Sequence, residues 1–161
     1  MEEITNNLFI GRLLDLGAFS LEEDAIVHAT QTIHYQIMGW NRTTNKPNKN
    51  HPNYIIWEKD NRLSLNWVDG AARLYNWSGP ETFIRILDFI ERWIDNRKVL
   101  IHCDQGFSRS PTLGLLYLAK RLKTISDDTY LDAKKEFQNI YPKYNPGGIG
   151  DYVNHYWNEI N

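Results

Sequence analysis

The sequence predicts one α/β domain, in which a central, mostly parallel, twisted sheet is flanked by helices on both faces. Three observations support this fold class. Short apolar segments of strand character alternate along the chain with longer segments of helical periodicity. The segment VLIHC at 99–103 is apolar and runs into a glycine-bearing loop and a helix, as a buried parallel strand does. The length of 161 residues fits a single domain spanning 1–161.

The N-terminal half contains the first strand candidates. NNLFIGRLLDLGAF at 6–19 has a short apolar centre that ends at a glycine, and it predicts an opening strand and turn. DAIVHATQ at 24–31 predicts a second strand, because its first half is apolar and β-branched. YIIWEKDNRLSLNWVD at 54–69 predicts two strands around a turn at Asp60-Asn61, because apolar residues alternate along its second half.

A polar segment at 39–53 separates these strands. GWNRTTNKPNKNHPN contains two prolines and several asparagines, which favour turns and loops over regular structure. We expect an exposed insertion in the domain. Its composition favours a solvated loop over a binding loop.

The C-terminal half is mostly helical. The segment 78–98 predicts a helix with Ser78 or Gly79 at its start and Pro80 in its first turn. We expect Phe83, Leu87, Ile90 and Ile94 to form a buried apolar stripe on one face of this helix. After the strand at 99–103, further helices are expected at about 109–123, 127–140 and 148–160, with a break at YPKYNPGG.

Composition excludes several classes of protein. The net charge of −2 gives no overall positive field for nucleic acid or an anionic membrane. The N-terminus lacks the apolar run of a secretory signal, and no segment has the length of a membrane helix. The single cysteine excludes an internal disulfide and a metal site built from several thiolates. We therefore expect a cytoplasmic monomer with no cofactor and no metal.

The single cysteine begins a loop that suits an anion. In CDQGFSR at 103–109, backbone amides at the start of the following helix lack partners within that helix. Gly106 allows a tight turn, and the guanidinium of Arg109 can hold two oxygens of a phosphoryl group. The same positive potential favours the thiolate form of Cys103. A nucleophilic sulfur beneath a bound phosphate is the arrangement for covalent phosphoryl transfer, with the hydroxyl of Ser110 beside the sulfur. We expect His102 to orient the loop through backbone contacts.

The segment HCDQGFSRS at 102–110 resembles the signature His-Cys-x5-Arg-Ser/Thr of cysteine-based protein tyrosine phosphatases, and it is most similar to that of the small dual-specificity branch. The resemblance implies that Cys103 is the nucleophile, Arg109 the phosphate clamp and Ser110 a hydroxyl donor to the sulfur. The residues implied in phosphate binding are Asp104, Gln105, Gly106, Phe107, Ser108 and Arg109. ITNNLFIGRLLD and YPKYNPGGIGDYVNHYW also resemble the opening strand and closing helices of this family, whereas 39–53 has no obvious counterpart. Gln105 departs from the usual alanine.

This family takes a proton donor from an aspartate on a loop upstream of the cysteine. Asp69 is the candidate, because it follows an alternating strand and precedes Gly70. Asp60 is a competitor, but it belongs to the predicted turn at the other end of that strand. Asp104 is near the phosphate, where an inward carboxylate would repel substrate, so we expect it to point away.

The sequence thus predicts a phosphoprotein phosphatase that acts on phosphotyrosine, with phosphoserine and phosphothreonine as further candidate substrates. A phosphorylated protein or peptide is the expected partner. Two alternatives remain: a phosphatase of a non-protein phosphate such as an RNA 5′-triphosphate, lipid or sugar phosphate, and a non-catalytic phospho-binding module. Phe107 is the expected exposed rim of the cleft, whereas Trp67 and Trp93 are expected to be packed.

Overall fold

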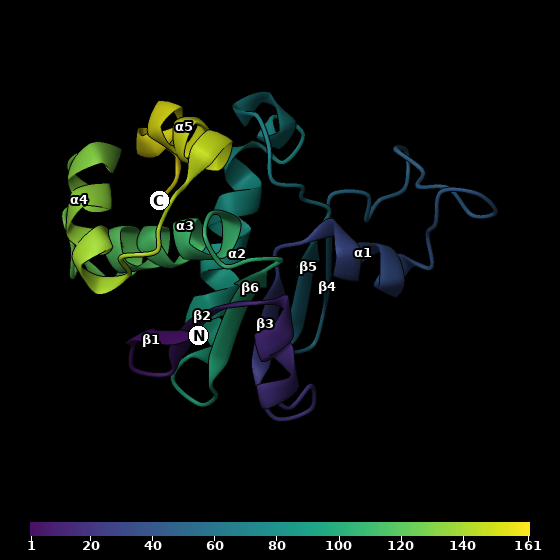
Figure 1. Cartoon of the computed structure of the whole chain (residues 1–161), viewed down its shortest axis with the longest axis horizontal. Coiled ribbons are helices and arrows are strands. Elements are labelled where there is room, and N and C mark those ends of the chain that lie inside the picture. The colour runs from purple at the N-terminus through teal and green to yellow at the C-terminus, as the bar shows by residue number, and fades with distance from the viewer.

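Six strands form one sheet in the order β1-β2-β6-β3-β5-β4 (Figure 1). The computed structural model describes all residues from 1 to 161. The four central strands run parallel, whereas the two edge strands pair antiparallel with their neighbours. The strands are β1 (Glu2–Thr5), β2 (Leu8–Arg12), β3 (Ala25–His28), β4 (Ile56–Lys59), β5 (Arg62–Leu65) and β6 (Val99–Cys103). This architecture confirms the predicted α/β class with a mostly parallel sheet.

The helices form unequal layers on the two faces of the sheet. Helices α2 and α3 pack on one face, and α4 and α5 pack outside α3 (Figure 1). Helix α1 and the short 3-10 helix η1 (Leu13–Ala18) contact strands of the sheet away from this layer. The helices are α1 (Gln31–Met38), α2 (Gly79–Trp93), α3 (Arg109–Leu116), α4 (Tyr130–Ile140) and α5 (Gly147–His155). No helix has both the length and the apolar character needed to cross a membrane.

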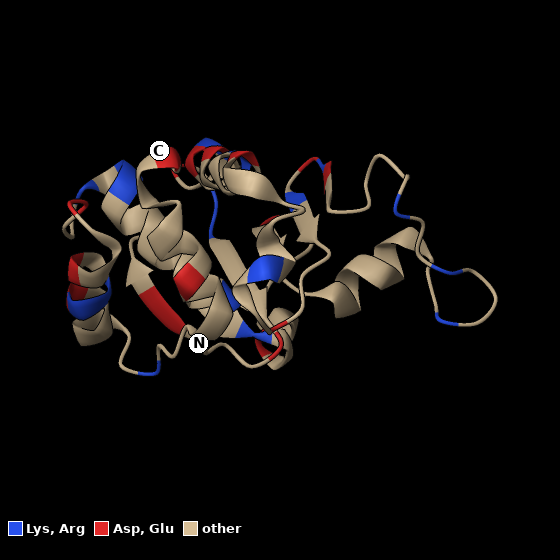
Figure 2. Ribbon diagram, turned by 90° about the horizontal axis from the view of Figure 1, so that it is seen from above, with Lys and Arg blue, Asp and Glu red and all other residues tan.

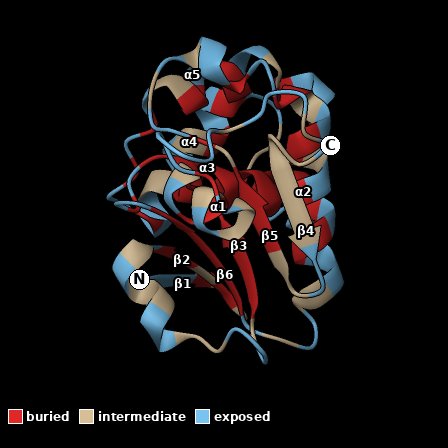
Figure 3. Cartoon of the chain, turned by 90° about the vertical axis from the view of Figure 1, so that its right-hand side faces the viewer, coloured by how far each residue is buried: buried red, intermediate tan, exposed pale blue.

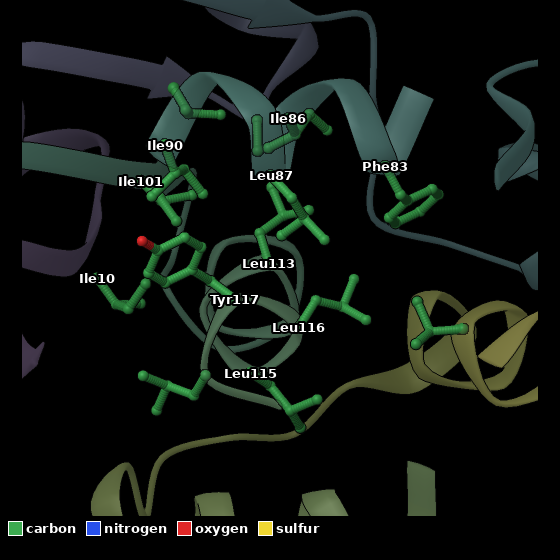
Figure 4. Packing of buried hydrophobic residues seen from close by; sticks show 14 of the residues in the cluster. Ile10, Phe83, Ile86, Leu87, Ile90, Ile101, Leu113, Leu115, Leu116 and Tyr117 are labelled. Carbon is green, nitrogen blue, oxygen red and sulfur yellow. The ribbon is translucent and has the colours of Figure 1, made fainter. Parts of the chain in front are cut away.

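The main core lies between the sheet and the pair α2 and α3. Every residue of α3 is buried, so this helix is enclosed on all sides (Figure 3). Figure 4 shows apolar side chains of α2 pointing toward those of α3, with Ile10 and Ile101 of the sheet beside them. The residues in this contact from α2, from α3 and from the helical turn that follows α3 include Phe83, Ile86, Leu87, Ile90, Leu113, Leu116 and Tyr117. This packing fixes the start of α3 relative to the end of β6.

The structure differs from the sequence prediction at several element boundaries. Helix α1 was not predicted; the Thr30 hydroxyl caps it by accepting from the amide of Thr32 at 3.2 Å, and Gly39 ends it with a φ of 70°. The edge strand β1 was not predicted either, because its sequence EEIT is half charged. The helix at 78–98 ends at Trp93, and the segment 39–53 has no helix or strand and is mostly exposed apart from Trp40.

Candidate active site

The loop at 103–109 connects the carboxyl end of β6 to the first residue of α3. Four of its carbonyl oxygens accept hydrogen bonds from the surrounding protein and are therefore turned away from the loop centre. The four bonds join Asp104 O to the Leu13 amide at 3.2 Å, Gly106 O to the Tyr141 hydroxyl at 2.7 Å, Phe107 O to the Asn145 amide at 2.8 Å, and Ser108 O to the Thr112 amide at 3.0 Å.

These carbonyl bonds determine where the loop amides point. In a trans peptide the N–H of each residue points opposite to the carbonyl of the residue before it. The amides that consequently face the loop centre are those of Gln105, Phe107, Ser108 and Arg109. Those of Gln105, Phe107 and Ser108 have no hydrogen-bond acceptor within the protein. Together with the N-terminus of α3, they form a cradle for an anion.

Gly106 allows the loop to close around the sulfur. Its φ of 78° favours glycine, and a Cβ at this position would lie 3.3 Å from the carbonyl oxygen of Gly11. Its amide donates to the Sγ atom of Cys103 at 3.2 Å. The turn therefore places a backbone donor directly on the sulfur.

The Cys103 thiol lies at the bottom of this loop and is only 2% exposed. The Ser110 hydroxyl lies 3.2 Å from Sγ and also donates to the carbonyl of Gly11 at 2.9 Å. A hydroxyl has one proton, so Ser110 cannot donate to both acceptors at once. When the sulfur is a thiolate, the stronger acceptor is the sulfur, and Ser110 is placed to stabilise it.

Arg109 is buried beside the loop, and one of its three nitrogen atoms has no hydrogen-bond partner. Its Nη1 donates to the carbonyl of Trp67 at 2.9 Å, and its Nη2 donates to a carboxylate oxygen of Asp104 at 3.3 Å. Its Nε is buried and has no acceptor within the protein. An anion oxygen in the loop would satisfy this donor, which is otherwise costly to bury.

The expectation that Asp104 points away is wrong. Its carboxylate lines the same cleft as Cys103 and is shared between Arg109 and the Thr30 hydroxyl, which donates to it at 2.6 Å. The guanidinium attracts the carboxylate toward the cleft, and Thr30 of the preceding β3–α1 connection holds it there. A phosphate in the loop therefore competes with Asp104 for one nitrogen of Arg109.

Asp69 lies in the same cleft as Cys103 and Arg109. The cleft has a volume of about 370 Å³, and Asp69 is exposed at its edge on the segment that follows β5. The Tyr75 hydroxyl donates to the carbonyl of Val68 at 2.8 Å, which fixes this segment next to the aspartate. The competitor Asp60 lies in the turn between β4 and β5, at the opposite end of β5.

A chain of hydrogen bonds reaches Cys103 from the other face of the sheet. Arg62 donates to Nε2 of His28 at 3.1 Å and 3.0 Å, and Nδ1 of His28 lies 2.6 Å from Nε2 of His102. Burial, followed by the effects of His102 and Arg62, lowers the pKa of His28 to about 2. Burial also lowers the pKa of His102 to about 4, so both rings are neutral near pH 7.

The aromatic residues near the cleft lie as the sequence predicts in two cases. Phe107 is 47% exposed at the rim, and Trp67 is buried with its Nε1 donating to the Ser78 hydroxyl at 2.8 Å.

Sequence reasoning missed the partners that hold the loop from a distance. Gly11, Tyr141 and Thr30 are remote in sequence and belong to no local motif, so only the folded chain reveals them.

Comparisons with known proteins agree with this geometry. No protein-family model matches the chain. It is 42% identical over 59 residues to the tyrosine-protein phosphatase vhp-1 of Caenorhabditis elegans, covering 36% of this chain and 9% of that protein. It is 32% identical over 106 residues to the human dual specificity protein phosphatase 9, covering 65% of this chain and 26% of that protein. The chain thus spans about a quarter or less of the length of these relatives.

Solved structures show the same fold over nearly the whole chain. The crystal structure of DUSP15 has a TM-score of 0.61 at 16% identity. The match covers 98% of our chain and 86% of the DUSP15 chain. The human tyrosine phosphatase-like serine/threonine/tyrosine-interacting protein has a TM-score of 0.62 at 21% identity, covering 99% and 93%. The chain thus has the fold of cysteine-based protein tyrosine phosphatases, and its sequence around the signature loop is similar to that of dual specificity phosphatases.

Proposed function

We propose that residues 1–161 form a single catalytic domain that hydrolyses phosphotyrosine in proteins through a cysteinyl-phosphate intermediate. The observation that carries this proposal is the anion cradle around Cys103. Inward amides and the free Nε of Arg109 surround its sulfur, and Asp69 lines the same cleft. The names of the relatives, tyrosine-protein phosphatase and dual specificity protein phosphatase, support this substrate class.

The first chemical step transfers the phosphoryl group to sulfur. The phosphate oxygens bind the loop amides and Arg109, which neutralises charge that develops in the transition state. The Cys103 thiolate attacks phosphorus, and the bond from phosphorus to the tyrosyl oxygen breaks. Asp69 supplies a proton to the departing oxygen, so that tyrosine leaves as a neutral phenol.

The second step releases phosphate. Water attacks the phosphorus of cysteinyl-phosphate, and the Asp69 carboxylate formed in the first step accepts a proton from that water. The bond between phosphorus and sulfur breaks, and the Ser110 hydroxyl stabilises the departing thiolate by donating a hydrogen bond to it, while keeping its proton. Inorganic phosphate leaves, and the thiolate is regenerated.

Hydrolysis assays with phosphopeptides test the proposal. We expect phosphate release from a phosphotyrosine peptide and from p-nitrophenyl phosphate, with phosphoserine and phosphothreonine versions of the same peptide as the test of dual specificity. Asp69→Asn should lose about 100-fold in kcat on the phosphotyrosine peptide and less on p-nitrophenyl phosphate, because p-nitrophenolate leaves without a proton.

Asp60→Asn is the matched control, because Asp60 adopts a φ of 53° that asparagine tolerates and lies away from the cleft. We expect it to leave both rates unchanged. Phosphopeptide binding without hydrolysis by the wild type would overturn the catalytic proposal and favour a phospho-binding module. Hydrolysis restricted to RNA 5′-triphosphate, lipid or sugar phosphates would overturn the protein substrate.

A further inference from the structure

The catalytic cleft continues into a groove that leads to the loop at 39–53. The cleft shares Gln31, Trp67 and Val68 with a neighbouring hollow of about 250 Å³. That hollow in turn shares Gln31, Lys49 and Tyr54 with a third hollow of about 440 Å³ beneath the loop. The three hollows therefore adjoin one another, and Gln31 lines all three; together we call them the groove.

The far part of the groove is positively charged. Arg42, Lys46, Lys49 and Arg73 line the second and third hollows, whose linings include no carboxylate. All four cations are exposed, and none forms an ion pair within the protein. Figure 2 shows blue segments and no red ones along the loop that extends beyond α1. This local charge contrasts with the net charge of −2 for the whole chain.

The near part of the groove is apolar. Val68, Leu74 and Trp77 are 38%, 39% and 59% exposed and line the second hollow, where Tyr54 packs against Trp77 at 5.6 Å between ring centres. The ammonium group of Lys49 lies 5.6 Å from the centre of the Trp77 ring. The apolar surface thus lies between the catalytic cleft and the cations of the loop.

Specific contacts hold the loop in place. The side-chain oxygen of Asn41 accepts from the amides of residues 43, 44 and 45, and Asn45 donates to the carbonyl of Gly39 at 2.7 Å. The base of the loop is anchored by Trp40, which is only 9% exposed and packs against His51 and other aromatic rings. Because these bonds fix the turn, the loop cations Arg42, Lys46 and Lys49 are held in place along the groove.

We propose that this groove is a recognition site for an acidic phosphopeptide, an inference that rests on the proposed phosphatase function. The phosphorylated residue enters the cleft at Cys103. A neighbouring apolar side chain packs on Trp77, and a carboxylate further along the peptide binds Lys49 and the cations of the loop. The loop at 39–53 is then a specificity element of the enzyme, in contrast to the solvated insertion that its composition favours.

The test compares two phosphotyrosine peptides, one with acidic residues flanking the phosphotyrosine and one with neutral residues at the same positions. The loop variant combines Arg42→Gln, Lys46→Gln and Lys49→Gln. Its matched control combines Lys59→Gln, Lys98→Gln and Lys135→Gln, which remove the same charge from exposed positions without ion pairs and outside the groove. The readout is the ratio of kcat/KM for the acidic peptide to that for the neutral peptide.

We expect the wild type and the control variant to prefer the acidic peptide, and the loop variant to lose about tenfold of this preference, mainly through KM. The preference should also decrease as salt is added, because exposed charges are screened. Equal ratios for the three proteins would overturn the recognition site while leaving the phosphatase function intact.

Binding measurements keep the two proposals separate. The same peptides are titrated onto Cys103→Ser versions of the three proteins, which retain the groove without the nucleophile. Weaker binding of the acidic peptide to the loop variant supports the recognition site even if the wild type hydrolyses nothing. A loop variant that loses affinity for single-stranded RNA but keeps its peptide preference would overturn the peptide as occupant.

Discussion

At the scale of single residues, the hydrogen-bond chain behind Cys103 has only one consistent set of proton positions. Arg62 is always a donor, so Nε2 of His28 must accept and its proton must lie on Nδ1. His28 therefore donates to Nε2 of His102, and the proton of His102 lies on Nδ1. That proton faces the carbonyl oxygen of Cys103 at 3.3 Å. The half-buried Arg62 thereby orients the histidine that precedes Cys103.

This chain predicts the tautomers of both histidines. We expect ¹⁵N NMR of the imidazole rings to show His28 and His102 protonated at Nδ1 and unprotonated at Nε2 near neutral pH. Arg62→Leu removes the donor to Nε2 of His28, so His28 should no longer prefer the tautomer protonated at Nδ1. A His102 ring protonated at Nε2 in the wild type would contradict the chain.

The sequence predicted the residues of the site that share one motif. Cys103, Arg109 and Ser110 lie at fixed spacing in a strand-loop-helix turn, and the structure places them together. The orientation of Asp104 was predicted wrongly, because attraction by the Arg109 guanidinium outweighs the repulsion between the carboxylate and a bound phosphate. His28 was not predicted at all, because its role depends on parallel pairing of β3 with β6.

At the scale of elements, α5 positions the segment that carries Asp69. Helix α5 packs on the 3-10 helix η2 (Ala72–Tyr75), and Gly148 lies directly against the chain at residues 70–72. A Cβ at 148 would lie 2.0 Å from the carbonyl oxygen of Gly70, so only glycine fits without movement of that segment. Gly148 in YNPGG thus serves the candidate acid as well as the first turn of α5.

Gly148→Ala should therefore impair the proton donation proposed for Asp69, and not the attack proposed for Cys103. The displaced segment moves Asp69 from the cleft, and kcat on a phosphotyrosine peptide should decrease about tenfold, with a smaller decrease on p-nitrophenyl phosphate. Gly17→Ala is the matched control, because a Cβ there contacts nothing within 4 Å. Equal losses on both substrates would contradict a role through Asp69.

Element prediction succeeded where a strand or helix has a clear apolar pattern. The strand at 99–103 and the two strands around Asp60 were predicted correctly, because each has an apolar run or alternation. Helix α1 was missed because its sequence QTIHYQIM buries only Ile33 and His34. Its position depends on tertiary contacts such as the bond between His34 and Ser64, which local periodicity does not reveal.

At the scale of the whole molecule, the sheet buries neutral histidines. His28, His34 and His102 are all buried, and burial lowers the pKa of each below the ordinary value of about 6.5. The unfolded chain therefore binds protons that the folded chain does not. Stability is full above about pH 6.5 and decreases as the pH falls toward the pKa of about 4 for His102.

Denaturant unfolding between about pH 7 and about pH 5 checks this prediction. We expect the free energy of unfolding to decrease on acidification, by up to about 1.4 kcal/mol per pH unit for each buried histidine. His28→Gln should make the free energy of unfolding less dependent on pH, by up to about 1.4 kcal/mol per pH unit, because the unfolded chain then binds one proton fewer. His155→Gln, at an exposed position, should not change the dependence. A free energy of unfolding that is constant or rises on acidification would contradict the prediction.

The fold class of the whole molecule was predicted from the sequence, whereas the groove was not. The fold class follows from the alternation of strands and helices along the chain, which local hydrophobic patterns reveal. The groove forms because three hollows from separate segments meet at Gln31, which no local pattern indicates.

The most direct test of the central claim is mass spectrometry of the enzyme during turnover. The wild type is mixed with a phosphotyrosine peptide and quenched in acid, and the peptide that contains Cys103 is analysed. We predict a mass increase of one HPO₃ unit on Cys103, absent from Cys103→Ser, which should also lose hydrolysis. Continued hydrolysis by Cys103→Ser, or turnover of the wild type without phosphate on Cys103, would contradict a cysteinyl-phosphate mechanism.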